Sequence, residues 1–298
     1  MLLLTTIAAD SETGNEARRG FYFGTDVGVS LPGDLESTRT NIGIPTNCDQ
    51  WLEAFIFEDG TNVPYPLDQC NPTALPGSPN SFDLGTGFLA GAHLGYAFRN
   101  FRIETEYFIR AHSGERLPLL VIGDPKQQEF VERSEKISDF RASSIFANFY
   151  YDFHTAKMPK VTPFLGVGVS LTDTTIDYSA ASIRTNDRNE LIILGRNPDA
   201  AGTASLANEI LSDNLVGYQL LAGLDYALSE GFYAGIKLRY GDAFENFQDG
   251  DNEWKPLRGH GSTVGPPGEP GGNLPVRYEI SADNLTFWGV SLSLKYFY

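Results

Sequence analysis

Apolar and polar residues alternate with a period of two along eight segments of the chain. In the first, from Phe21 to Leu31, mostly apolar side chains alternate with Tyr, Gly, Asp and Ser. A period of two puts successive side chains on opposite faces of an extended strand, so each segment predicts a strand with one apolar face. The eight predicted strands cover residues 21–31, 82–98, 101–112, 138–154, 161–171, 216–226, 232–240 and 288–298.

The connections between these strands alternate between long and short. The long ones are 32–81, 114–137, 177–211 and 245–278, and three short turns separate the remaining strands. Long loops at one end and short turns at the other are typical of a membrane barrel with an even number of antiparallel strands. We therefore interpret 20–298 as one barrel domain, preceded by an N-terminal tail, 1–19.

The polar face of the strands carries charges of both signs among glycines. If this face lines a narrow lumen, glycine leaves room for long side chains, and charges removed from water must pair. We therefore expect a polar network inside the barrel, in which Asp26 of the first strand lies near Lys295 of the last. Its predicted members are Asp26, Arg102, Glu104, Glu106, Arg110, Asp152, Asp225, Lys237, Arg239 and Lys295.

The apolar face carries aromatic residues near the strand ends, among them Phe21, Phe98, Trp288 and Tyr298. Membrane barrels have aromatic girdles at these positions, and they close because hydrocarbon cannot hydrogen-bond a free strand edge. The pattern predicts an all-β fold, an eight-stranded antiparallel transmembrane up-and-down β-barrel with long extracellular loops. A soluble barrel with the apolar face inside is the alternative.

Composition and charge exclude several classes of function. The formal net charge of −16 argues against nucleic acid, whose protein partners are normally basic. The 31 glycines and 17 prolines argue against a helical fold. The longest stretch without a charged side chain, 84–98, contains four glycines, so no transmembrane helix of about 20 apolar residues can be placed.

The first nine residues, MLLLTTIAA, look like the end of a secretory signal, an apolar run followed by small residues. An apolar tail or a short first strand is the alternative. Export would place the chain in an oxidising compartment, where the only two cysteines, Cys48 and Cys70, can form a disulfide within the first long loop. Two buried free thiols remain the alternative.

Three stretches carry a resemblance to a known family: GFYFGTDVG at 20–28, VTPFLGVGV at 161–169 and GVSLSLKYFY at 289–298. They resemble the small outer-membrane β-barrels of the opacity-protein and OmpA/OmpX-like superfamily, over the strands but not the loops. The resemblance implies location in the outer membrane and contact with its lipid and lipopolysaccharide. It also implies that the barrel-assembly machinery recognises the C-terminal strand.

A few residues are candidates for chemistry. His112, Ser113 and Glu115 offer a base, a nucleophile and an acid, and lipid A deacylases on similar barrels use Ser and His near the outer rim. Neighbouring strand residues point to opposite faces, however, so a polar rim is the simpler interpretation. Residues 249–253 (DGDNE) have alternating oxygen ligands but lack the rest of a calcium loop. His93 is expected to hydrogen-bond its neighbours, and we predict no catalytic residue, metal or cofactor.

The favoured function is a non-enzymatic surface protein whose acidic loops serve envelope integrity, adhesion or contact with an extracellular protein partner. Inward-facing Tyr22, Phe108, Phe164 and Tyr233 predict a filled lumen, which argues against the alternative of a narrow pore for small solutes. A lipid A-modifying enzyme is a further alternative, and it needs a Ser and a His side by side at the rim.

The Cys48–Cys70 disulfide is tested by titrating thiols in the unfolded, exported protein before and after reduction. We expect no thiol before reduction and two afterwards. The stabilisation should stay within the first loop, because closing a loop of about 20 residues contributes about 3 kcal/mol. Equal thiol counts in the two samples would contradict the disulfide.

Overall fold

The computed structural model describes residues 19–42, 75–77, 79–124, 127–154, 157–195, 198, 201–255, 262–264, 270–274 and 277–298. Cys48 and Cys70 lie outside these residues, as does the stretch 1–18, so the disulfide stays a prediction. Among the described residues, no helix has the length and apolar character needed to cross a membrane.

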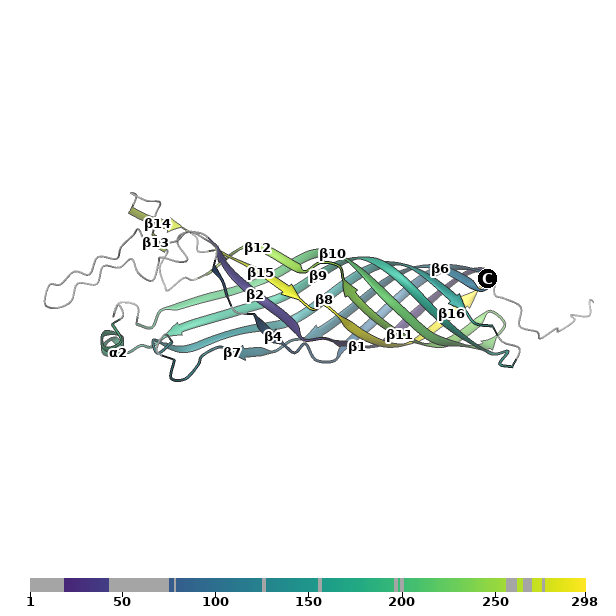
Figure 1. Ribbon diagram of the computed structural model, residues 1–298, viewed down its shortest axis with the longest axis horizontal. Coiled ribbons are helices and arrows are strands. Elements are labelled where there is room, and N and C mark those ends of the chain that lie inside the picture. Colours follow the sequence, from purple (N-terminus) through teal and green to yellow (C-terminus); the bar gives the residue numbers. More distant parts are fainter. Residues whose placement is uncertain are drawn as a thin grey trace, which may run out of the picture.

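Eight antiparallel strands form a closed barrel (Figure 1), which confirms the predicted fold class. They are hydrogen-bonded in the order β6-β5-β1-β16-β11-β10-β9-β8, and the pairing of β6 with β8 completes the ring. The first and last strands are neighbours, with Val27 opposite Leu292. The eight strands are β1 (Arg19–Pro32), β5 (Gly87–Phe98), β6 (Phe101–Ser113), β8 (Phe130–Asp152), β9 (Val161–Arg184), β10 (Ala204–Ser229), β11 (Phe232–Ala243) and β16 (Phe287–Phe297).

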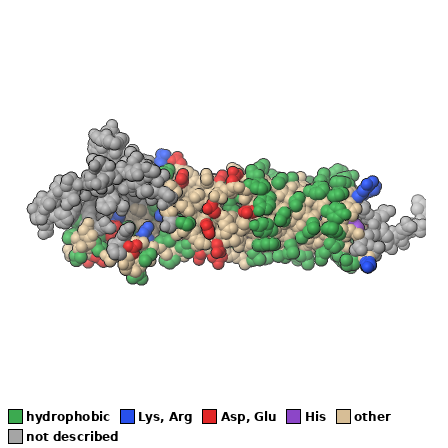
Figure 2. All heavy atoms as spheres, in the orientation of Figure 1, with side chains coloured by type: hydrophobic (Ala, Val, Ile, Leu, Met, Phe, Trp, Pro, Cys, Tyr) green, Lys and Arg blue, Asp and Glu red, His purple; other side chains and the backbone are tan. Residues whose placement is uncertain are grey.

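Aliphatic and aromatic side chains cover the outside of the barrel toward the end that carries the C-terminus. Figure 2 shows them as a green band around this part of the molecule. Toward one edge of the band Tyr240 packs on Trp288, with ring centroids 5.0 Å apart, and toward the other Phe98 packs on Phe101 at 5.7 Å. An apolar band between two aromatic girdles is the outer surface of a transmembrane barrel.

Strands β8, β9 and β10 continue well beyond the apolar band, and there their inward face changes character. Inside the band this face carries polar side chains such as Asn148 and Gln219, whereas beyond it Phe140, Ile176 and Leu211 are almost completely buried. The outward face beyond the band meets water, so the apolar side chains turn inward to be buried. The extracellular part is therefore built like a soluble β protein.

A second sheet covers this apolar inner face (Figure 1). It has the order β12-β15-β2-β3, and β4 also pairs with β2. The two sheets share one hydrophobic core, to which Phe82 of β4, Phe247 of β12 and Ile280 of β15 belong. The strands of this sheet are β2 (Leu35–Ile42), β3 (Leu75–Pro76), β4 (Asn80–Phe82), β12 (Phe247–Glu253) and β15 (Arg277–Asp283).

Short elements complete the extracellular end. Strand β7 (Arg116–Pro118) pairs with β8, and β13 (Ser262–Val264) pairs with β14 (Pro270–Leu274). Helix α2 (Arg188–Ile193) connects β9 to β10, and Asp187 caps its first turn by accepting from the backbone of Asn189.

The structure contains strands inside all four segments that the sequence predicted as long loops. Strands β8, β9 and β10 take up parts of 114–137 and 177–211, while β2 and β12 lie within 32–81 and 245–278. Two causes account for the difference. The outward apolar face that marks a strand in the sequence ends where the outside of the barrel becomes aqueous. Register shifts in β8, between Phe130 and Glu132 and between Ile137 and Asp139, also interrupt the alternation.

Leu292→Arg and Ile210→Arg form a matched pair that tests the position of the hydrocarbon. Both side chains are exposed on the outer surface, at 64% and 76%, but Leu292 lies in the apolar band and Ile210 beyond it. In liposomes, Leu292→Arg should lower the free energy of unfolding by about 2–4 kcal/mol, because its charge would sit in hydrocarbon. Ile210→Arg should lower it by less than about 0.5 kcal/mol. Urea unfolding measures both free energies, and equal losses would contradict this placement of the apolar band.

Candidate functional site: an ion-pair network in the barrel lumen

The inward face of the barrel strands brings nine charged side chains together inside the apolar band. All nine are at most 4% exposed. We call this group the lumen network. It comprises Asp26 of β1, Arg102, Glu104 and Glu106 of β6, Asp152 of β8, Asp225 of β10, Lys237 and Arg239 of β11, and Lys295 of β16.

The centre of the lumen network joins β11 to β1 and β6, neither of which is its neighbour in the barrel. Lys237 Nζ donates to Asp26 Oδ2 at 2.7 Å, and Arg239 Nη2 donates to Glu106 Oε1 at 2.8 Å. Lys237 Nζ is also 3.7 Å from Glu106 and 3.9 Å from Glu104. Each cation therefore faces more than one carboxylate, as groups removed from water require.

A second part of the network lies toward the C-terminal end. Arg102 contacts Asp152 Oδ1 through both Nε and Nη2, at 3.0 and 2.9 Å, and its Nη1 lies 3.6 Å from Asp225. Lys295 Nζ donates to the other oxygen of Asp225 at 2.7 Å. The Arg102 guanidinium also lies over the ring of Tyr150, 4.7 Å from its centroid.

Neutral side chains hydrogen-bond the carboxylate of Glu104 and connect it to the rest of the network. Glu104 accepts hydrogen bonds from Tyr22 at 2.9 Å, Tyr150 at 2.8 Å and Asn148 at 3.2 Å. Gln219 accepts from Arg239 at 2.9 Å and donates to Asn148. These amides were not among the predicted members of the network, although they occupy inward positions of the same alternating pattern.

Glycines leave the space that the long side chains fill. A side chain on Gly24 would begin 2.3 Å from His93 Nε2, and one on Gly235 would begin 2.5 Å from Asp225 Oδ1. Both distances are too short for any real Cβ. Glycine is therefore required on the lumen face wherever a large side chain crosses a neighbouring strand.

An apolar layer closes the lumen on the extracellular side of the network. It consists of Leu89, Phe108, Phe146 and Phe287, all at most 5% exposed. The Arg239 guanidinium lies over the Phe108 ring, 4.1 Å from its centroid, so the layer and the network are in direct contact. At this level, aromatic rings and ion pairs fill the interior.

One residue that we expected near Asp26 has a different ion-pair partner, and one predicted member lies outside the network. Lys295 pairs with Asp225 and not with Asp26, because Gly235 on the intervening strand lets the Asp225 carboxylate reach it. Arg110 lies beyond the apolar layer, between the rings of Phe140 and Phe287, and forms no ion pair with a described carboxylate. Its Nη2 donates to the carbonyl of Leu285 at 3.3 Å.

Comparison with known proteins gives the family. The family model of the Opacity family porin proteins matches residues 94–253, more than half of the chain. The chain belongs to this family. The protein is therefore a porin-like surface protein of the outer membrane. No curated protein matches the chain.

Several solved outer-membrane proteins resemble this Opacity family chain. OprG from Pseudomonas aeruginosa is 13% identical, with 96% of this chain and 99% of that chain covered and a TM-score of 0.46. Neisserial surface protein A is also 13% identical, with 94% and 97% covered and a TM-score of 0.39. The outer-membrane protease OmpT from Escherichia coli is 8% identical, with 93% and 97% covered and a TM-score of 0.40.

The structure separates the residues that could have formed a catalytic group in this Opacity family chain. His112 points inward, with its Nδ1 3.1 Å from the carbonyl of Gly85, whereas Ser113 is exposed on the outer face. Glu115 accepts from the backbone of Asp83 at 2.8 Å. These three side chains therefore do not form a catalytic triad of acid, base and nucleophile.

The acidic segment considered for calcium is part of β12. Asp249 accepts from the backbone N–H of Ser212 at 2.6 Å, and Asp251 pairs with Arg277 at 2.5 Å. These carboxylates connect neighbouring strands, so both oxygens of Asp249 and one oxygen of Asp251 already have protein partners.

A polar cluster within the extracellular core fastens the second sheet to the barrel strands. Arg39 of β2 pairs with Glu135 of β8 at 2.5 Å and donates to the Tyr178 hydroxyl at 3.2 Å. It also lies over the Trp254 ring. Burial raises the pKa of the Tyr178 hydroxyl above its ordinary value, so the hydroxyl stays neutral beside Glu135. This cluster was not predicted, because its members lie in segments assigned to loops or to loop boundaries.

Lys237→Met and Lys255→Met compare a buried with an exposed ion pair. Lys237 is 0% exposed and its partner Asp26 would be left without its closest cation, whereas Lys255 is 69% exposed and 3.5 Å from Glu253. Lys237→Met should lower the free energy of unfolding by about 3–5 kcal/mol. Lys255→Met should lower it by less than about 1 kcal/mol. Chemical unfolding in lipid measures the difference, and similar losses would show that the lumen charges contribute no special stability.

Proposed function

We propose that this protein is a closed, non-enzymatic surface barrel that anchors a folded extracellular extension for contact with a partner. The observation that carries the proposal is the filled lumen. Lys237 and Phe108 are 0% and 1% exposed, and the ion pairs of the lumen network span the barrel from wall to wall. A solute path would require these pairs to separate inside a hydrocarbon-enclosed space, which costs several kcal/mol.

The outward face of the second sheet supports a role in partner contact. Exposed carboxylates lie on three of its strands, at Glu36 of β2, Asp251 of β12, and Glu279 and Asp283 of β15. Figure 2 shows acidic side chains between the apolar band and the extracellular end. Such a surface favours a partner with basic side chains, because complementary charge speeds association and disfavours acidic competitors.

Two further partners follow from the place of the barrel in the membrane. The outward apolar band contacts outer-membrane lipid, and we propose that its extracellular edge meets lipopolysaccharide. The C-terminal strand β16 alternates apolar and polar residues up to Phe297 and Tyr298. We propose that the barrel-assembly machinery recognises this strand, and deletion of these two residues should reduce the amount of inserted barrel. Normal insertion of the truncated chain would contradict that role.

Conductance across a planar bilayer tests the closed lumen. The reconstituted protein should produce no stepwise current at moderate voltage, while a large porin reconstituted in the same way provides the positive control. A steady single-channel current from the folded barrel would instead support the pore and contradict the proposed function.

Binding of a polycation tests the acidic surface. Fluorescent polylysine should bind proteoliposomes of the protein, and binding should weaken at high salt because exposed charges are screened. The double variant Glu279→Gln/Asp283→Asn should bind less, whereas Glu230→Gln, in the exposed turn at the opposite end of the barrel, should bind like the parent protein. Equal binding by all three would remove the second sheet from the proposal.

A further inference from the structure

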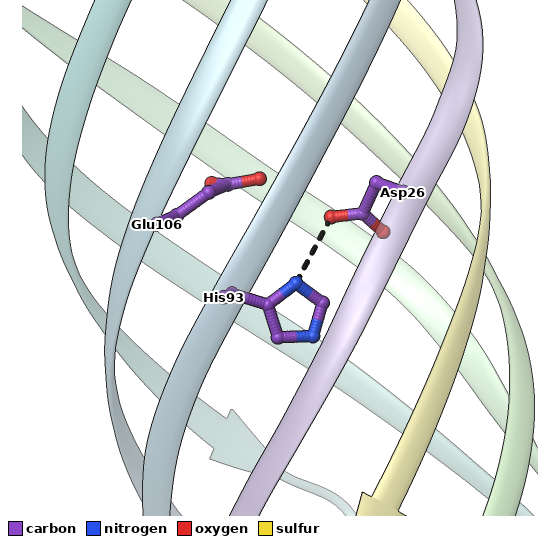
Figure 3. A group of neighbouring side chains, drawn as sticks. All are labelled: Asp26, His93 and Glu106. Carbon is purple, nitrogen blue, oxygen red and sulfur yellow. Dashed lines mark ion pairs between the residues drawn. The ribbon is translucent and has the colours of Figure 1, made fainter.

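His93 lies inside the lumen between the carboxylates of Asp26 and Glu104, which come from different strands. Figure 3 shows its ring beside Asp26, with Glu106 nearby. Its ring is 0% exposed and occupies the space above Gly24. Nδ1 lies 3.3 Å from Asp26 Oδ2, and Nε2 lies 3.8 Å from Glu104 Oε2. Among the described residues, neither ring nitrogen has a partner in hydrogen-bond geometry.

The charges around His93 do not balance if its ring is neutral. The lumen network contains the carboxylates Asp26, Glu104, Glu106, Asp152 and Asp225, and the cations Arg102, Lys237, Arg239 and Lys295. One negative charge is therefore left over. Arg110 does not supply the missing cation, because the apolar layer lies between it and the network. An unpaired charge in such an enclosed space is strongly destabilising.

One bound proton removes this imbalance, and the geometry points to its place. A neutral imidazole has a single N–H donor, whereas an imidazolium has two, one for each flanking carboxylate. We propose that the lumen network is a proton-binding site, in which His93 holds one proton between Asp26 and Glu104 at neutral pH. The proposal concerns the chemistry of the lumen and goes beyond the proposed surface function.

The other charged and titratable groups near His93 agree with a proton at this place. Glu104 accepts hydrogen bonds from three neutral donors, and Glu106 accepts from Arg239. If either carboxyl were protonated, its own O–H would point toward groups that are themselves donors. The groups around the ring are Tyr22 and Asp26 on β1, Glu104 and Glu106 on β6, Lys237 and Arg239 on β11, and Lys295 on β16.

A metal ion at the same place fits less well. Asp26, His93 and Glu106 place their ligand atoms within 4.8 Å of one another, which is close enough for a metal to be considered. The ammonium of Lys237 already lies 2.7 Å from Asp26 and 3.7 Å from Glu106. A divalent cation would have to displace it, and would exceed the single missing positive charge.

Nitrogen NMR of the histidine rings observes the proton directly. The full chain, with ¹⁵N-labelled histidine, is placed in phospholipid nanodiscs at pH 7 and treated with EDTA. Its four histidines give few signals, and the one absent in His93→Gln belongs to His93. We expect both nitrogens of His93 to be protonated. A single protonated nitrogen, or a signal that changes between EDTA-treated and zinc-supplemented samples, would overturn the proton site.

The variant Asp26→Asn tests the charge balance by removing the excess negative charge. It removes one carboxylate, so the remaining four carboxylates balance the four cations and His93 should become neutral at pH 7. Glu253→Gln removes an acidic group from the exposed part of β12 and should leave His93 protonated. A protonated His93 in Asp26→Asn would contradict the charge balance. If this variant does not fold, the nitrogen spectrum of the unaltered protein still shows whether His93 carries the proton.

Discussion

A charge inside a barrel that is surrounded by hydrocarbon has little water to solvate it, so its stabilisation must come from partners within the lumen. The ion pairs meet this requirement by joining strands that are not neighbours. Lys237 and Asp26 connect β11 with β1, and Lys295 and Asp225 connect β16 with β10. Arg239 and Glu106 connect β11 with β6, on opposite sides of the ring. Together these pairs hold the walls of the barrel together and fill its interior, which links the stability of the fold to its closed lumen.

The surroundings of each stretch of strand decide what its two faces carry. Along β9, Val167 and Val169 face outward in the apolar band, while Ile176 and Tyr178 face inward beyond it. The same strand thus serves a membrane barrel at one end and a water-soluble sandwich at the other. This change lets a small barrel support a folded extracellular surface, on which the proposed partner contact depends.

Sequence alternation was enough to predict the ring of strands and the inward position of residues such as Asp26 and Arg239. It could not predict partners, because these depend on strand tilt and on which side chains glycines let pass, as Gly235 does for Asp225. Arg110 follows the same alternation as Glu106 but lies beyond the apolar layer, a level that periodicity does not report. His93 became informative only when its two carboxylate neighbours and the charge balance were known.

A double-mutant cycle on Asp26 and Lys237 tests most directly whether paired lumen charges hold the barrel together. Unfolding free energies are measured in lipid for Asp26→Asn, Lys237→Met and the double variant. If the pair is coupled, the double variant loses less stability than the two single variants combined, with a coupling energy of about 1–3 kcal/mol. Purely additive losses would show that the two charges act independently, which would contradict the central role of the network.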